Sequence, residues 1–275
     1  MKTIIVTGAN SGIGKEASLH LAKSGHRVVM LSRDSEKSNQ ALEEIRSQSH
    51  NQNVSLVKAD LSSPRAITSA VEKIKRDHEV VDVLVNNAGV YKVKRQENDN
   101  GIEMTFAVNF LAAFMLSQML LKKLEASGNG RIINVVSELY KGGSLDFNDL
   151  MLENKYKAGD AYANSKLAAV LYTVELAKQI TDKGITVNAL HPGVLATSSF
   201  RDYPYFFVKL MNLFLEDPQK GGERIAYLAT SDEVADATGK YFYKTEEREI
   251  DISAYGTATT QNLLQIAREL TGLQS

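Results

Sequence analysis

The sequence predicts one α/β domain built around a doubly wound parallel sheet. Three observations lead to this fold class. Short runs of β-branched residues alternate with longer amphipathic segments, a glycine-rich turn joins the first run to the first helical segment, and polar residues follow several of the runs. The 275 residues contain no repeat or linker, so we expect a single domain over residues 1–275.

Six apolar runs are expected to form the main strands, and each reads as a continuous hydrophobic segment. Such runs are typical of a parallel sheet, because right-handed crossovers cover both of its faces with helices. The predicted strands are residues 3–6, 27–31, 54–57, 81–85, 132–136 and 185–190, with a last strand at 240–243.

Amphipathic segments between these runs are expected to form helices. They comprise residues 14–23, 35–47, 64–77 and 161–180, and the C-terminal segment 261–270 has the same periodicity. The alternating order is that of a Rossmann fold, in which ligands bind at the carboxyl ends of the strands.

The composition excludes several kinds of partner. The hydrophobic fraction of 43% and the charged fraction of 24% are ordinary for a globular protein, and a net charge of −1 offers no basic field to nucleic acid. The chain has no cysteine and its five histidines form no metal-ligand pattern, so we expect no metal. The first apolar run is too short for a signal peptide or a membrane span, which predicts a cytoplasmic protein without a membrane span.

The stretch VTGANSGIGKE resembles two kinds of phosphate-binding loop. A nucleoside triphosphate loop requires glycine where this chain has Ala9 and a hydroxyl where it has Glu16, so that interpretation fails. A dinucleotide loop uses glycines to bring the backbone close to a pyrophosphate at a helix N-terminus. The loop residues expected at such a dinucleotide are Gly8, Asn10, Ser11, Gly12, Ile13 and Gly14.

The end of the second strand bears on which dinucleotide binds. An acidic residue there usually holds the ribose 2′-hydroxyl of NAD, whereas this strand ends in Ser32 and Arg33. A guanidinium suits a 2′-phosphate by charge and by bidentate geometry, which favours NADP(H) over NAD(H). Asp34 is the alternative ribose ligand, and NAD(H) then stays possible.

Tyr162 and Lys166 are expected to lie on one face of a helix, one turn apart. An ammonium beside a phenol lowers the pKa of the phenol toward the range of a general acid or base. Tyr205 and Lys209 have the same spacing, and we interpret them as part of a covering segment with a solvated lysine.

Other polar residues are expected at the same edge of the sheet as Tyr162. Ser137 follows the fifth predicted strand, and Asn86 and Asn87 follow the fourth. Because parallel strands end at one edge, these side chains are candidates for a shared site.

Several motifs in this order resemble the short-chain dehydrogenase/reductase family. They are TGANSGIG, NNAG at 86–89, FAVNF around Asn109, Ser137, YANSK and HPG at 191–193. SRD, RIINVVS, KYF and the C-terminal LLQIARELTGL are similar to its retinol-dehydrogenase-like branch, which uses NADP.

The resemblance implies a catalytic tetrad of Asn109, Ser137, Tyr162 and Lys166. Tyr162 would exchange a proton with the substrate oxygen, Ser137 would hydrogen-bond that oxygen, Lys166 would also bind the nicotinamide ribose, and Asn109 would hold a water. It also implies cofactor contacts from Asp60, Leu61, Asn87, Ala88, Gly89, Tyr162, Lys166, Pro192, Gly193, Val194 and Thr197. Asp60 could equally cap the next turn, and Asn109 could be a locally satisfied polar residue.

The resemblance further implies a substrate lid over residues 198–216 and a likeness to homodimeric relatives. The lid segment is rich in aromatic residues and leucine, which predicts a lipophilic alcohol or carbonyl substrate, although the lid could instead touch a membrane. Membrane-bound retinol dehydrogenases carry an apolar anchor before the glycine loop that this sequence lacks, so retinol itself is not expected. The alternative function is a catalytically silent dinucleotide sensor or scaffold on the same fold.

Overall fold

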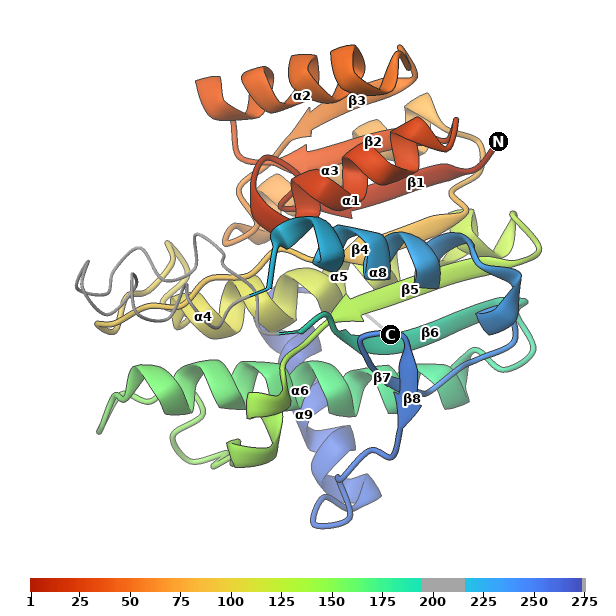
Figure 1. The fold of residues 1–275 in the computed structure, drawn as a ribbon. Helices are drawn as coiled ribbons and strands as arrows, with labels where there is room; N and C mark the ends of the chain where they lie inside the picture. The colour runs from red at the N-terminus through yellow and green to blue at the C-terminus, as the bar shows by residue number, and fades with distance from the viewer. Residues whose placement is uncertain (194–215, 274–275) are drawn as a thin grey trace.

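The strands of the described residues form one mixed sheet with a Rossmann-type order. The computed structural model describes residues 1–193 and 216–273 (Figure 1). In this part of the chain the order is β3-β2-β1-β4-β5-β6-β7-β8, and only the last pair is antiparallel. The fold class predicted from the sequence is therefore confirmed.

The strand bounds agree closely with the apolar runs. The strands are β1 Thr3–Thr7, β2 Arg27–Ser32, β3 Val54–Lys58, β4 Val83–Asn86, β5 Gly130–Val135, β6 Ile185–His191, β7 Tyr241–Tyr243 and β8 Glu246–Arg248. Sequence patterning did not predict β8, because its three residues are charged and exposed and give no hydrophobic signal.

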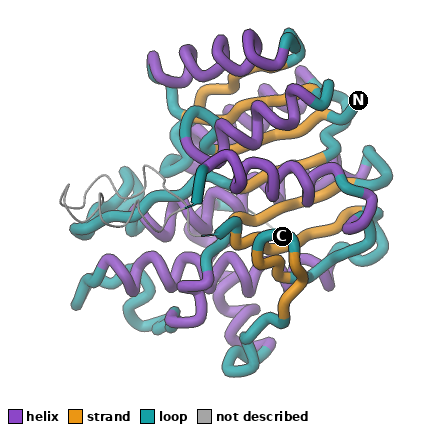
Figure 2. The backbone as a smooth tube through the Cα atoms, viewed as in Figure 1, coloured by secondary structure: helices purple, strands orange, loops and turns teal. Residues whose placement is uncertain are grey.

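Helices cover both faces of the sheet, and Figure 2 shows the two layers. On one face lie α1 Gly12–Lys23, α2 Glu36–Ser49 and α8 Pro218–Thr230, which share one hydrophobic cluster. On the other face lie α3 Pro64–Asp77, α5 Ala112–Glu125, α6 Ala158–Gln179 and α9 Thr257–Thr271, which share a second cluster. In β1, Ile4 and Val6 join the first cluster and Ile5 the second, as a pleated strand between two helical layers requires.

Short helical turns complete the described part of the chain. They are α4 Met104–Phe106, the π-helical turn η1 Ala107–Leu111, the 3₁₀ turn η2 Glu138–Gly142 and the 3₁₀ turn η4 Asp232–Val234. Side chains cap two of the longer helices: Ser35 Oγ accepts from the Ser38 N–H, and Ser63 Oγ accepts from the Ala66 N–H.

One helical stretch of the described residues, Met104–Glu125, is long and apolar enough to cross a membrane, with a mean hydropathy of 1.7. Its most apolar window is 72% buried inside the fold. Burial of that kind is expected of a core helix packed between a sheet and neighbouring helices.

Candidate active site

The turn after β1 forms a backbone cradle in which Gly8, Gly12 and Gly14 occupy positions that disfavour any side chain. Gly8 and Gly12 have φ values of +65° and +53°, in the left-handed region. A Cβ placed on Gly14 would lie 2.4 Å from Asn87 Nδ2 and 2.5 Å from the Gly8 carbonyl oxygen. The N-cap residue Ser11 makes no side-chain cap bond, and the first turn of α1 holds no acidic residue. The N-terminus of α1, whose N–H groups have no side-chain cap, and the close approach of the backbone at Gly14 suit a pyrophosphate. The residues of this turn therefore fit a dinucleotide.

Thr7 ties the glycine turn to the end of β4. Its Oγ1 accepts from the N–H groups of Asn87 and Ala88 at 2.9 and 2.8 Å and donates to the Val85 carbonyl oxygen at 3.3 Å. Asn87 Nδ2 donates to the Thr7 carbonyl oxygen at 2.9 Å. These bonds fix the predicted cofactor residues of both strands in one rigid unit, at the point where the strand order reverses.

Lys15 settles the triphosphate alternative. In a nucleoside triphosphate loop this lysine contacts the phosphates. Here the Lys15 ammonium pairs with the carboxylate of Glu44 on α2. The loop therefore has the lysine, paired with Glu44, but lacks the first glycine and the hydroxyl.

Ser38 organises the end of β2. The buried Ser38 hydroxyl donates to the Arg33 carbonyl oxygen at 2.7 Å and bonds the side chains of Asn10, Ser32 and Ser35. The Arg33 side chain is exposed. Asp34, the alternative ribose ligand, forms an ion pair with Lys58 Nζ at 2.8 Å, so its charge is compensated within the protein.

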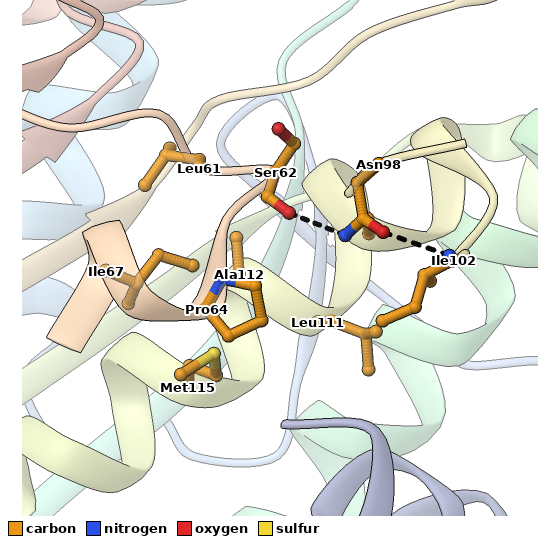
Figure 3. A pocket seen from close by; sticks show the side chains of 10 residues that line it. Leu61, Ser62, Pro64, Ile67, Asn98, Ile102, Leu111, Ala112 and Met115 are labelled. Atoms are coloured by element: carbon orange, nitrogen blue, oxygen red, sulfur yellow. Dashed lines mark hydrogen bonds between the residues drawn. The ribbon is translucent and has the colours of Figure 1, made fainter. Parts of the chain in front are cut away.

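Asp60 caps the turn that leads into α3. Its Oδ1 accepts from the Ser62 N–H at 2.9 Å and from the Ser62 hydroxyl at 2.8 Å, the capping role considered from the sequence. Leu61 is buried and lines a small apolar pocket between α3 and α5 (Figure 3). Asn98 closes the pocket by donating to the Ser62 carbonyl oxygen at 2.6 Å.

Ser137, Tyr162 and Lys166 meet at the carboxyl end of β5. The Tyr162 hydroxyl hydrogen-bonds the Ser137 side chain. Lys166 Nζ lies 5.5 Å from the centre of the Tyr162 ring and donates to the Val135 carbonyl oxygen at 2.9 Å. The spacing on α6 therefore brings the phenol and the ammonium to one face, as the sequence predicts.

The pKa of Tyr162 corrects one expectation. The sequence led us to expect that Lys166 lowers it, but burial raises the pKa of Tyr162 to about 12, and the Ser137 hydrogen bond offsets only part of that rise. Burial also lowers the pKa of Lys166 to about 8. Both shifts have one physical cause, since removal from water disfavours the charged form of each group. The protein alone therefore holds Tyr162 as a neutral proton donor.

Asn109 lies in the π-helical turn and clamps the loop after β4. Its Oδ1 accepts from the Val90 N–H at 2.7 Å, and its Nδ2 donates to the Val90 carbonyl oxygen at 3.0 Å and to Ser165 Oγ at 3.1 Å. A Cβ on Gly89 would lie 3.5 Å from Asn109 Oδ1 and 3.7 Å from Lys166 Nζ. The side chain is locally satisfied and also positions Gly89 beside the Lys166 ammonium.

Arg224 fixes the loop after β6. Its Nη1 donates to the Pro192 carbonyl oxygen at 2.6 Å, while its Nη2 pairs with Glu216, which also pairs with Lys244 at 2.7 Å. These cations hold the pKa of Glu216 below its ordinary value. A Cβ on Gly193, with φ of +101°, would lie 2.6 Å from Arg224 Nη1. Val194, Thr197, Tyr205, Lys209 and all but Glu216 of the predicted lid lie outside the described residues.

Two other polar residues of the motifs turn into the core. Asn86 Nδ2 donates to Asn134 Oδ1 at 2.8 Å and to Ser117 Oγ at 3.1 Å, and only 5% of Asn86 is exposed, so it does not join the site. The buried His191 ring packs against Tyr243 at 5.2 Å between centres. Within residues 1–193 and 216–273, no cluster of His, Cys, Asp and Glu is arranged to hold a metal.

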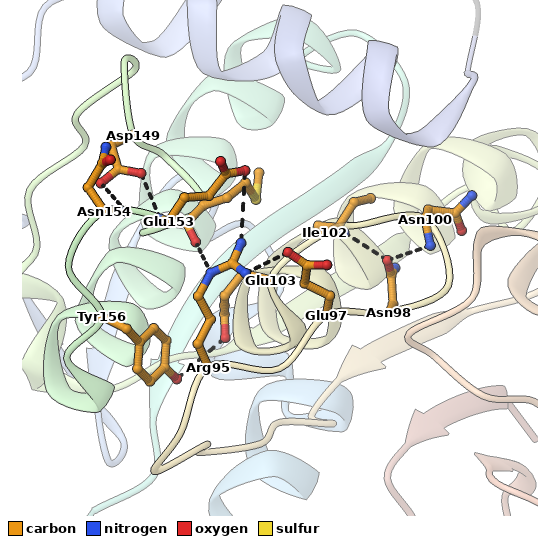
Figure 4. A network of polar contacts seen from close by, with 11 residues as sticks. Arg95, Glu97, Asn98, Asn100, Ile102, Glu103, Asp149, Glu153, Asn154 and Tyr156 are labelled. Atoms are coloured by element: carbon orange, nitrogen blue, oxygen red, sulfur yellow. Dashed lines mark hydrogen bonds and ion pairs between the residues drawn. The ribbon is translucent and has the colours of Figure 1, made fainter.

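The insert between Ser137 and Tyr162 is fastened at several places. On α6, Asn164 Oδ1 accepts from the Ser144 N–H at 2.8 Å. Across the site, Arg95 Nε donates to the Met151 carbonyl oxygen at 3.0 Å, and its guanidinium also contacts the carboxylates of Glu97 and Glu153 (Figure 4). The insert is therefore tied both to α6 and to the loop after β4.

Sequence reasoning missed three residues that organise this edge. Thr7 stands inside the glycine motif and could have been found as a hydroxyl at a strand end. Ser38 stands three residues after the helix-capping Ser35, a weaker signal. Arg224 is distant in sequence from Pro192 and gives no local signal.

The comparisons with known proteins agree with this geometry. The short chain dehydrogenase family matches over residues 2–204. The chain belongs to the short-chain dehydrogenase/reductase family and is an NAD(P)-dependent oxidoreductase of CH–OH groups.

Its curated relatives include retinol dehydrogenases. Retinol dehydrogenase 13 of Mus musculus is 39% identical over 99% of this chain and 84% of its own length. Retinol dehydrogenase 14 of Homo sapiens is 34% identical over 99% of this chain and 87% of its own length.

Solved structures share the fold. The crystal structure of an uncharacterized protein from Mycobacterium paratuberculosis has a TM-score of 0.79 at 25% identity and covers 99% of this chain and 94% of its own. A short chain dehydrogenase from Burkholderia cenocepacia, solved in complex with NADP, has a TM-score of 0.71 at 24% identity and covers 88% of this chain and 95% of its own.

Proposed function

We propose that the protein is an NADP(H)-dependent oxidoreductase that interconverts an alcohol and a carbonyl on a lipophilic small molecule. The observation that carries this proposal is the meeting of the Tyr162 phenol with Ser137 and the buried Lys166 ammonium at the edge that also holds the glycine cradle. Those groups supply a proton donor, a second hydrogen-bond donor and a positive charge at one point.

The residues act on the oxygen of the substrate. In reduction, Tyr162 delivers its proton to the carbonyl oxygen, and Ser137 donates a hydrogen bond to the same oxygen. Lys166 places a positive charge beside the phenolate that is left. A nicotinamide held at the glycine cradle would supply the hydride in reduction and accept it in oxidation.

NADP(H) is the proposed cofactor because basic side chains gather at the end of β2. Arg33 is exposed on a backbone held by Ser38, and Asp34 is neutralised by Lys58. Replacement of Arg33 by Ala is expected to weaken NADPH binding by about 1.5 to 3 kcal/mol, the contribution of a charged hydrogen bond, and to leave NADH binding unchanged. Arg76→Ala, an exposed arginine at the far end of α3, is the control; equal weakening of both cofactors in Arg33→Ala would contradict the assignment.

A lipophilic substrate is proposed because exposed apolar side chains follow the site residues. Val93, 45% exposed, stands in the loop after β4, and Leu139, 60% exposed, stands two residues after Ser137. Apolar surface at the mouth of a site favours apolar ligands through the area it removes from water. The names of the relatives, retinol dehydrogenases 13 and 14, fit a lipophilic alcohol or its carbonyl form.

A panel experiment tests the function against its silent alternative. Thermal shift with NADPH, NADH and ATP with magnesium is expected to show stabilisation by NADPH alone or NADPH most strongly. NADPH absorbance is then followed with decanal, 4-nitrobenzaldehyde and propanal. Oxidation of NADPH by an aldehyde supports the enzyme, whereas stabilisation without turnover of any aldehyde, or of the matching alcohols with NADP⁺, would favour the sensor or scaffold. The cytoplasmic location and the homodimer stay predictions.

A further inference from the structure

Tyr91 packs directly against the predicted proton donor. The ring centres of Tyr91 and Tyr162 are 5.6 Å apart, and the rings are tilted by 49°. Tyr91 stands two residues after Gly89, whose Cα faces Lys166, and its side chain is half-buried. The contact therefore joins the loop after β4 to the reacting end of the site.

The backbone on both sides of Tyr91 is held. Val90 is clamped through its N–H and its carbonyl oxygen by Asn109. The Lys92 carbonyl oxygen accepts from the Tyr156 hydroxyl at 2.7 Å. Because Val90 is fixed to η1 and Lys92 is fixed to the segment just before α6, the Tyr91 ring has a defined position beside Tyr162.

The same anchors connect to the catalytic helix. Ser165, which accepts from Asn109 Nδ2, donates to the Tyr162 carbonyl oxygen at 2.7 Å. Tyr156 stands just before α6, and beyond Tyr91 the loop exposes Val93 and is tied to the insert through Arg95 (Figure 4). Tyr91 is thus the side chain of this loop that contacts Tyr162, and we call the loop from Tyr91 to Arg95 the wall.

We propose that Tyr91 is a specificity-determining residue, whose ring packs against the apolar group attached to the carbonyl carbon of the substrate. A carbonyl oxygen that hydrogen-bonds Tyr162 places the substituents of that carbon beside the neighbouring ring. An aromatic ring held in position favours a flat aromatic substituent over a short alkyl chain. The inference deepens the proposed function and rests on it for the placement of the carbonyl.

The test compares two aldehydes in the intact enzyme. Tyr91→Ala is expected to lower the ratio of kcat/KM for 4-nitrobenzaldehyde to kcat/KM for propanal by about 3- to 10-fold, the range of an aromatic pair. Tyr91→Phe, which keeps the ring, is expected to keep the ratio, and NADPH affinity is expected to be unchanged in both variants. Tyr227→Ala on α8, another half-buried tyrosine, is the control and should leave the ratio unchanged. An equal loss for both aldehydes in Tyr91→Ala, or no change, would overturn the proposal.

A binding measurement separates this inference from the proposed function. Equilibrium dialysis of 4-nitrobenzyl alcohol against the protein saturated with NADPH reports the wall contact without turnover. Weaker binding to Tyr91→Ala by about 3- to 10-fold supports the wall even where no aldehyde is reduced, an outcome that rejects only the enzymatic function. Equal binding to wild type and Tyr91→Ala rejects the wall whatever the activity.

Discussion

The two sides of the carboxyl edge are held by different kinds of contact. On the cofactor side, Thr7 and Asn87 join β1 to β4 through short bonds to backbone groups, and Gly14 lies against Asn87 and Gly8. On the substrate side, long loops are joined by side chains such as Arg95, and its partners Glu97 and Glu153 are exposed. The cofactor side is part of the sheet, whereas the substrate side is attached to it.

This difference teaches where the fold tolerates change. A cradle made of backbone contacts admits one geometry, because an added methyl group meets main-chain atoms that cannot move independently. Loops held by exposed ion pairs can be altered at small cost in stability. We therefore expect substitutions on the cofactor side to act on binding and folding, and substitutions on the substrate side to act on selectivity.

The largest effect on cofactor binding is expected from closing the cradle. In Gly14→Ala the new Cβ would lie 2.5 Å from the Gly8 carbonyl oxygen. We expect NADPH affinity to fall about 100-fold, equivalent to about 2.7 kcal/mol, measured by fluorescence titration. Gly159→Ala in α6 is the matched control, because nothing lies within 4 Å of its Cβ, and it should bind NADPH as wild type does. Wild-type affinity in Gly14→Ala would contradict the cradle.

The lowered pKa of Lys166 predicts a pH dependence of kcat/KM that is similar in size to the effect of Gly14→Ala on affinity. Its pKa of about 8 lies below the ordinary 10.5, so the ammonium is lost as the pH rises through about 8, while Tyr162 stays protonated to about 12. The kcat/KM for NADPH in carbonyl reduction, which reports free-enzyme groups, should fall about tenfold per pH unit above pH 8. A profile that is flat to pH 10 would contradict a Lys166 pKa near 8 that governs the reaction.

The same shift has a consequence for stability. Between pH 8 and 10.5 the unfolded chain binds more protons at Lys166 than the folded chain does. The free energy of unfolding therefore rises with pH across this window, and that gain is lost as the pH falls to 8. Urea unfolding of the wild type and Lys166→Met at pH 8 and 10 would show it. An equal change in the free energy of unfolding of both proteins between pH 8 and 10 would show that Lys166 makes no such contribution.

Thr7→Val is expected to have an intermediate effect. It keeps the shape of the side chain and removes the acceptor of two N–H groups, so the free energy of unfolding should fall by about 1 to 3 kcal/mol in urea denaturation. Thr7→Ser restores the acceptor and should recover most of the loss. A neutral Thr7→Val would mean that the tie between β1 and β4 adds nothing to stability.

The smallest effect is expected on the substrate side. Arg95→Gln should lower the free energy of unfolding by less than about 1 kcal/mol, because the carboxylates it contacts are exposed. Cleavage of the insert by trypsin at the exposed Lys155 and Lys157 should become about 3- to 5-fold faster, corresponding to the same energy. NADPH affinity should be unchanged, and Arg76→Gln is the control. Equal cleavage rates would show that Arg95 does not hold the insert.

The success of the predictions made from the sequence also differs between the cofactor side and the substrate side. Strands buried on both faces are continuous apolar runs, so β1 to β6 and the glycine turn were predicted with bounds close to those observed. The meeting of Ser137 with Tyr162 followed from strand ends and helical spacing. The pKa of Tyr162 could not be predicted, because it depends on burial that no local pattern encodes. Arg224, Arg95 and Tyr91 act across long sequence distances, and only the folded chain shows their partners.

The central claim is that the Tyr162 phenol transfers the proton at a site that binds NADPH independently of it. The most direct measurement is the turnover and the NADPH dissociation constant of Tyr162→Phe beside wild type, with the most reactive aldehyde of the panel. We predict that kcat falls about 10²- to 10⁴-fold while the dissociation constant changes less than about threefold. Turnover by Tyr162→Phe at the wild-type rate would contradict the claim.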